Sequence, residues 1–145
     1  MTPAAILTQI KTTLTGNADL TTFGLKKVFE GIRENVSTDD YPFIAIEPAE
    51  NDEERAVREI NGNIDPFITF GISGFIRDTN PDTQLATLFN FEKLIKVALC
   101  ADVKLGGNAV NSKFGKVLYD NQFWPVRAVM LTFVVQYRQN FKTRV

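Results

Sequence analysis

The chain has 145 residues, a formal net charge of −1, 44% hydrophobic residues and 23% charged residues. This composition predicts one globular domain over residues 1–145, and it excludes a disordered chain or a strongly basic nucleic-acid binder. The sequence has no histidine and one cysteine, which excludes Ser-His and Cys-His catalytic pairs, His-ligated metals and an internal disulfide. No apolar run reaches the roughly 18–20 residues that span a bilayer, so we expect no membrane partner.

The first predicted element is a helix that Thr2 caps and that ends at Gly16. The segment 17–24 is expected to form a loop. Short strands are predicted at 25–31 and at 42–48, and a proline should end the second of them. The apolar stripe of the helix, at helical spacing, consists of Ile6, Leu7, Ile10 and Leu14.

Residues 49–63 are the most polar and charged part of the chain. Their acidic run, 50–54, lacks the ligand spacing of a calcium loop and is typical of a solvated segment. Asn61-Gly62 is typical of a two-residue turn between strands. We therefore predict a protruding charged β-hairpin with arms at 53–60 and 64–77. The second arm places four apolar residues on one face: Ile68, Phe70, Ile72 and Ile76.

A second helix is predicted to start at Asn80 and Pro81 and to run to about Ala101. Cys100 lies near its apolar side and is expected to be a small core residue. The expected central stripe of this helix comprises Leu85, Leu88, Ile95 and Leu99, with Phe89, Phe91 and Ala98 beside it.

The C-terminal part is predicted to contain a glycine turn at 105–108, a strand at 113–119 and a long final strand at 126–137. The polar tail, 138–145, is expected to fray. One face of the final strand is uniformly apolar or aromatic: Val129, Leu131, Phe133, Val135 and Tyr137. The other face has the intermediate polarity of a subunit contact or a partly covered surface: Ala128, Met130, Thr132, Val134 and Gln136.

The order of helices and strands predicts an α+β fold, with a mostly antiparallel sheet and two helices packed on one face. Gly71 and Gly74 lie inside a predicted strand, where they should permit a bend or close packing. Neither they nor Gly106-Gly107 precede a helix in a phosphate-binding pattern. No serine, threonine or lysine stands in a nucleophile motif. We therefore expect no catalytic residue, no cofactor and no metal.

The order of elements matches a known family over nearly the whole chain. An amphipathic helix is followed by a short strand, a strand bounded by prolines, a charged hairpin, a long strand, a second helix with a Leu-Gly-Gly turn, and a final strand ending in an aromatic. The short strand is 27–31 and the strand bounded by prolines is 41–48. The long strand ends at 77–78, the second helix leads into 102–107, and the final strand ends at 134–137. This layout resembles that of the tail terminator (tail completion) proteins of long-tailed bacteriophages. It contains no catalytic signature.

The resemblance implies a structural protein of the virion tail, without enzymatic activity, that is assembled in the host cytoplasm. Such proteins form a hexameric ring on the head-proximal end of the tail tube. The implied partners are further copies of the chain, the tail tube protein and the head connector protein. DNA would pass through the lumen without sequence-specific binding.

Opposite charges, and aromatic residues at a sheet end, indicate candidate contacts between subunits. We hypothesise that the acidic hairpin reaches a neighbouring subunit or faces the lumen, where like charge would let DNA slide. Aromatic residues at a sheet end are either interface anchors or plugs of that end. The candidate interface or lumen residues are Glu50, Asp52, Glu53, Glu54, Arg55, Arg58, Lys26, Lys27, Arg138, Met130 and Trp124.

Three alternatives remain open from the sequence. The chain could be a head–tail connector or a tube component of the same particle. It could be a regulatory domain that binds a small molecule, which would need a pocket with convergent polar groups. It could be an enzyme that uses carboxylates alone, although no paired-carboxylate motif is evident.

Overall fold

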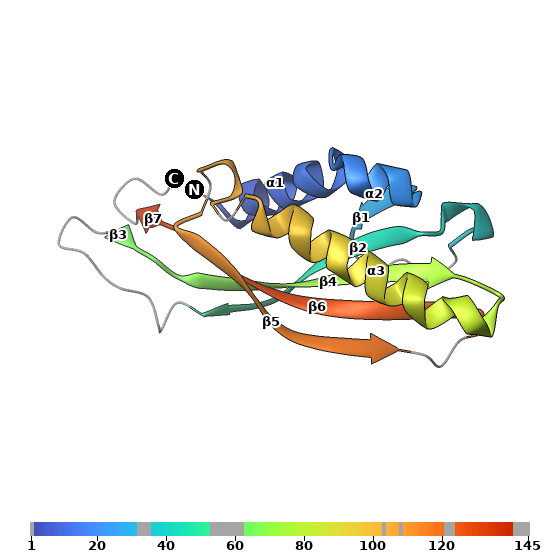
Figure 1. Ribbon diagram of the computed structural model, residues 1–145. Coiled ribbons are helices and arrows are strands. Elements are labelled where there is room, and N and C mark those ends of the chain that lie inside the picture. The colour runs from blue at the N-terminus through green and yellow to red at the C-terminus, as the bar shows by residue number, and fades with distance from the viewer. Residues whose placement is uncertain are drawn as a thin grey trace.

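The computed structural model describes residues 2–31, 36–52, 63–102, 104–107, 109–120 and 124–140. Three helices lie on one face of a five-stranded sheet, and a two-stranded sheet stands at one end (Figure 1). The predicted α+β class is confirmed. The helices are α1 (Pro3–Thr15), α2 (Ala18–Phe23) and α3 (Pro81–Cys100), with 3-10 turns η1 (Thr38–Asp40) and η2 (Leu105–Gly107). The strands are β1 (Lys27–Glu30), β2 (Phe43–Asp52), β3 (Asn63–Ile64), β4 (Phe67–Arg77), β5 (Asn111–Asp120), β6 (Val126–Gln136) and β7 (Gln139–Asn140).

The five-stranded sheet has the order β1-β2-β4-β6-β5. Strand β1 runs parallel to β2, and every other neighbouring pair is antiparallel. The sheet is therefore mixed but mostly antiparallel, as predicted. Strands β1 and β5 are its two edges, and β4 lies in its centre.

The N-terminal helix is capped as predicted, but a second short helix replaces the expected loop at 17–24. The Thr2 side chain accepts a hydrogen bond from the Ala5 amide at 3.2 Å and caps α1. Asn17 caps α2 in the same way, accepting from the Leu20 amide at 3.0 Å. The loop prediction was wrong because six residues are too few to show a clear apolar period, although the capping residue was visible.

The core lies between the helices and the sheet. The apolar face of β6 is fully covered, with Val129, Leu131 and Val135 at 0% exposure, which confirms the prediction for the final strand. The predicted face of β4, from Ile68 to Ile76, is buried against the same helices. Each strand therefore gives alternate side chains to one core, as a half-covered sheet requires.

The buried face of α3 confirms Leu88, Ile95 and Leu99 of the predicted stripe and differs from it at Leu85. Phe91 is completely buried, whereas Leu85 and Phe89 are about half exposed. Cys100 is exposed, so its predicted place in the core was wrong. Relative to the predicted stripe, the buried face is turned toward Phe91, whose ring lies against Gly74 of β4 and stacks on that of Phe23 in α2 at 4.8 Å between centroids. The sequence prediction could not include this contact, because it assigned the residues of α2 to a loop.

Two residues hold α3 close to the sheet. A Cβ atom on Gly74 of β4 would come within 2.9 Å of the Phe91 ring, which confirms the predicted close packing at this glycine. Gln84 is buried, and its Nε2 donates to the carbonyls of Asp78 and Pro125, each at 3.0 Å. The start of α3 is thereby tied to the turn before β6.

The charged hairpin differs from its prediction where the structure describes it. The first predicted arm, 53–60, and its turn lie outside the described residues. The partner of β4 is β2, which runs from Phe43 to Asp52 and pairs Asp52 with Phe67. Pro48 does not end β2, because β1 stops opposite Ile46 and leaves one side of β2 without a partner strand there among the described residues.

The first residues of the polar tail are ordered by pairing. Strand β7 pairs with β3, with Ile64 opposite Gln139. The expected fraying is therefore wrong for residues 138–140, because the tail finds a partner 75 positions earlier in the chain. Residues 141–145 lie outside the described part of the chain.

Candidate assembly surface

One face of the sheet has no helix over it (Figure 1). The side chains of β4 and β6 that do not enter the core point to this side. The same holds for Phe29 of β1, since Val28 and Glu30 are directed to the helices. We call this surface the open face. Its residues are Phe29, Phe43, Ala45, Thr69, Gly71, Ser73, Phe75, Leu118, Ala128, Met130, Thr132 and Val134.

Four aromatic rings form a cluster at one end of the open face. Phe43 is at its centre and stacks on Phe75 with 4.7 Å between ring centroids. Phe29 meets Phe43 edge to face at 5.5 Å between ring centroids, and the Tyr41 ring is tilted against Phe43 at 5.0 Å. Phe43 is 2% exposed, so this cluster is a small second core without helical cover.

The remainder of the open face exposes apolar side chains. Met130 is 44% exposed and lies directly opposite Leu118, which is 50% exposed. Trp124, which lies at the turn before β6 and is not one of the open-face residues, is 62% exposed. Large apolar side chains that gather on a surface mark contact sites more often than isolated ones do. The sequence missed Leu118, because its strand has no clean alternation to reveal which face each residue takes.

The two edges of the sheet differ in length and protection. Edge strand β5 has ten residues and edge strand β1 has four. The register of β5 with β6 shifts between Phe114 and Val117, and Lys113 and Lys116 lie beside this bulge. Bulges and lysines are devices that prevent another strand from pairing with an edge. The second half of β5, Val117–Asp120, has neither.

The candidate residues predicted from sequence fall at opposite ends of the sheet. Glu50 is exposed on β2 opposite Thr69, and Asp52 ends that strand. Lys26 and Lys27 lie at the other end, where β1 begins. The structure therefore does not bring these two charge groups together within one chain. Outside the described residues are Glu53, Glu54, Arg55 and Arg58.

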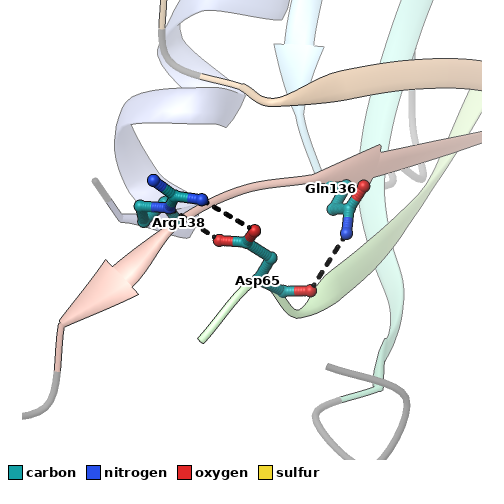
Figure 2. Close-up of polar contacts among 3 residues, drawn as sticks. All are labelled: Asp65, Gln136 and Arg138. Atoms are coloured by element: carbon teal, nitrogen blue, oxygen red, sulfur yellow. Dashed lines mark hydrogen bonds and ion pairs between the residues drawn. The ribbon is translucent and has the colours of Figure 1, made fainter. Parts of the chain in front are cut away.

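Arg138 is held within its own chain. Its Nε and one terminal nitrogen donate to the two carboxylate oxygens of Asp65 at 2.9 and 3.1 Å (Figure 2). Gln136 donates to the Asp65 carbonyl at 3.4 Å. This two-point pair holds the start of the tail against the segment before β4. Sequence reasoning missed Asp65, because 73 positions separate it from Arg138.

Lys27 lies between the open face and the η1 turn. Its ammonium is 3.0 Å from the Asp40 carboxylate and 5.9 Å from the centroid of the Phe29 ring. Its side chain remains about half exposed. The cation is therefore oriented by two neighbours at the β1 edge while solvent still reaches it.

Tyr119 lies on β5, the other edge strand of the sheet, and its side chain is on the face that the helices cover. Its ring meets that of Phe89 of α3 edge to face, at 5.6 Å between centroids. Its hydroxyl donates to the Glu92 carboxylate, and this hydrogen bond raises the pKa of Tyr119. Both rings are about half exposed, so a second apolar patch lies along β5 and α3.

The described residues offer no obvious chemistry. In that part of the chain, no three His, Cys, Asp or Glu side chains are grouped closely enough to hold a metal ion. Its helices include none that is long and apolar enough to cross a membrane. The candidate features of this part of the chain are surfaces: the open face, the two unlike edges β1 and β5, and the end of the sheet that carries Glu50.

Comparisons with known proteins find similar folds among solved structures. No family model and no curated protein matches the sequence. A chain in the structure described as "Virion of native gene transfer agent (GTA) particle" matches with a TM-score of 0.53 and 14% identity. The match covers 93% of this chain and 92% of that chain. At this identity the likeness shows a shared fold, over nearly the full length of both chains.

Proposed function

We propose that this chain is a structural protein of a phage tail, which caps the tail tube as a hexameric ring and joins it to the head. The observation that carries the proposal is the fold shared with a virion chain over 93% of the sequence. The match spans nearly the full length of both chains, so it concerns the whole fold and not a single motif.

The surfaces of the chain agree with the geometry of a ring. A closed ring of identical subunits needs two different surfaces on each subunit, one complementary to the other. The sheet offers two unlike edges, β1 and β5, and an open face with Met130 and Leu118 exposed. None of these surfaces needs a catalytic group, in keeping with a structural role.

The acidic end of the sheet is proposed to face a neighbouring subunit or the lumen. Glu50 is exposed there, and Glu53 and Glu54 follow directly in the sequence. Carboxylates in the lumen would repel the DNA phosphates and let the DNA slide. Reversing the charges of Glu53 and Glu54 to lysine should impair ring formation or infectivity. Unchanged assembly together with unchanged infectivity would refute this role for the acidic end.

Light scattering after size-exclusion chromatography, combined with electron microscopy of tails, tests the proposed role. We expect a hexamer, or a monomer that forms hexamers on tail tubes. Tails assembled without the protein should be overlong, because nothing would stop the addition of tube subunits. Tails of normal length that fail to join heads would instead identify a connector. A strict monomer with a tightly bound small ligand would refute an assembly role.

A further inference from the structure

The two edges of the sheet are aligned with each other across all five strands. The pairings place Lys27, Phe43, Phe75, Ala128 and Asp120 in one row. The next three rows begin on β1 with residues 28, 29 and 30, and they end on β5 with residues 119, 118 and 117. The four residues of β1 therefore share their rows with Val117–Asp120, the unprotected half of β5. The half of β5 that contains the bulge lies outside these four rows.

We propose that β5 of one copy pairs with β1 of the next copy, so that the sheets of neighbouring subunits continue into one another. This deepens the ring proposed above and rests on it. Strand β5 runs opposite to β1, so a subunit placed beside another in the same orientation would pair them antiparallel. Addition of a strand to an exposed edge is a common mode of protein recognition.

The chemistry of the two edges matches in this register. Lys27 would lie opposite Asp120 of the neighbouring copy, and these side chains carry opposite charges. The Lys27 ammonium has three N–H donors, so it can keep Asp40 and still bind a second carboxylate. Phe29 would lie opposite Leu118 of the neighbouring copy. The Phe29 ring would then cover part of the Leu118 side chain, which is 50% exposed in one copy.

Tyr119 would lie opposite Val28 on the side of the helices. A shallow hollow in that region is lined by Thr15 of α1, Thr21 of α2 and Val28 of β1. The Tyr119 ring projects on the same side, since it contacts Phe89 of α3. In the proposed pairing, the exposed rings of Tyr119 and Phe89 in one copy would therefore lie beside the hollow near Val28 in the next copy.

The distribution of protection along β5 supports this choice of partner. Lys113, Lys116 and the bulge block strand addition where β1 of a neighbour could not reach. The half without such devices has the same length as β1. The unprotected part of β5 is therefore the part that has a complement in β1.

Disulfide trapping tests the register. All variants carry Cys100→Ser, because Cys100 is exposed and would react. Residues directly opposite in an antiparallel pair are close enough for a disulfide after modest adjustment. Under mild oxidation Phe29→Cys and Leu118→Cys should each remain uncrosslinked alone and form dimers when mixed. The double variant should give a ladder that ends at the size of the ring.

A matched control lies in the same row and on the same face. Met130→Cys mixed with Phe29→Cys should give no dimer, because Met130 is one strand inside the edge. Self-crosslinking of Leu118→Cys alone would show a symmetric contact between two β5 edges and overturn the proposed pairing. Ring-sized particles without the mixed crosslink would overturn the pairing and leave the ring intact. A monomer without crosslinks at every concentration, alone and on tail tubes, would overturn both.

Discussion

The two faces of the sheet are formed by the same strands but differ in how far their side chains are buried. On the face under the helices, Ile72, Leu131 and Val129 are at 0% exposure and contact a continuous core. On the open face, the same strands present small, polar or half-exposed side chains such as Thr132 and Met130. Phe43 is an exception, since it is buried within the aromatic cluster without a helix over it. The covered face thus has the packing that supplies stability, and the open face has the intermediate polarity that we predicted for a subunit contact or a partly covered surface.

The largest expected effect on stability comes from replacing two phenylalanines of β4 that lie on opposite faces of the sheet. Phe70→Ala removes a ring that is 1% exposed in the main core, and we expect a loss of about 3–5 kcal/mol of unfolding free energy. Phe75→Ala removes a half-buried ring from the aromatic cluster and should cost about 1–2 kcal/mol. Urea unfolding at one fixed protein concentration measures both values, since assembly would otherwise shift the apparent stability. Equal losses would show that the open face contributes to folding as much as the covered face does.

A second test uses two glycines of the same strand. Gly74→Ala places a Cβ atom 2.9 Å from the Phe91 ring and 3.1 Å from Ile95, so these side chains or α3 itself must shift, at a cost of about 1–3 kcal/mol. Gly71→Ala meets nothing closer than the Glu47 carbonyl at 3.9 Å. Because alanine restricts the unfolded chain, this change should be neutral or stabilising by about 0.5–1 kcal/mol. Thermal unfolding of the two variants gives the comparison, and a stabilising Gly74→Ala would contradict the close approach of α3.

A third test asks whether Arg138 stabilises one chain or serves the contact between chains. Arg138→Ala leaves the Asp65 carboxylate, which is largely buried, without its two-point partner. The Arg138 side chain is 47% exposed, which weakens the pair, so we expect a loss of about 1–2 kcal/mol. Arg138→Lys should recover only part of it, because an ammonium cannot bind both oxygens in the same way. Unchanged urea unfolding, together with lost assembly, would return Arg138 to the interface that its charge first indicated.

The sequence predicted what depends on local pattern. The alternation from Val129 to Tyr137 is long enough to define one face, and Asn80-Pro81 defines the start of α3 because both residues act within one turn. The missed features depend on residues far apart in the chain. Neither the rotation of α3 toward Phe23 nor the pairing of Arg138 with Asp65 has any local signal.

The same limit applies to the candidate surface. Lys27 was identified by its charge, and Met130 by the intermediate polarity of its strand face. Their relation to Asp120 and Leu118 required the order of the strands and the register of each pair. A one-residue change of register would move every side chain of a strand to the other face, so the sequence alone could not define the open face.

The smallest expected effect concerns the residue that anchors α3, the helix over the covered face. Asp78 accepts hydrogen bonds from the Asn80 amide at 2.9 Å and from the Thr83 hydroxyl at 2.7 Å, and these bonds lower the pKa of its carboxyl. A lowered folded-state pKa means that the stabilisation is present above the unfolded-state pKa of about 3.9 and is lost as the pH falls through the folded-state value.

Asp78→Asn should therefore be slightly less stable than the native chain at neutral pH, and the difference should shrink as the pH falls below about 4. Asp82→Asn, in the first turn of the same helix, is the matched control for the loss of a negative charge near the helix start. Thermal unfolding across this pH range measures both variants. A constant difference for Asp78→Asn would show that its carboxyl charge has no part in holding α3, and that the cover of the sheet depends on the packing around Phe91 and Gly74 alone.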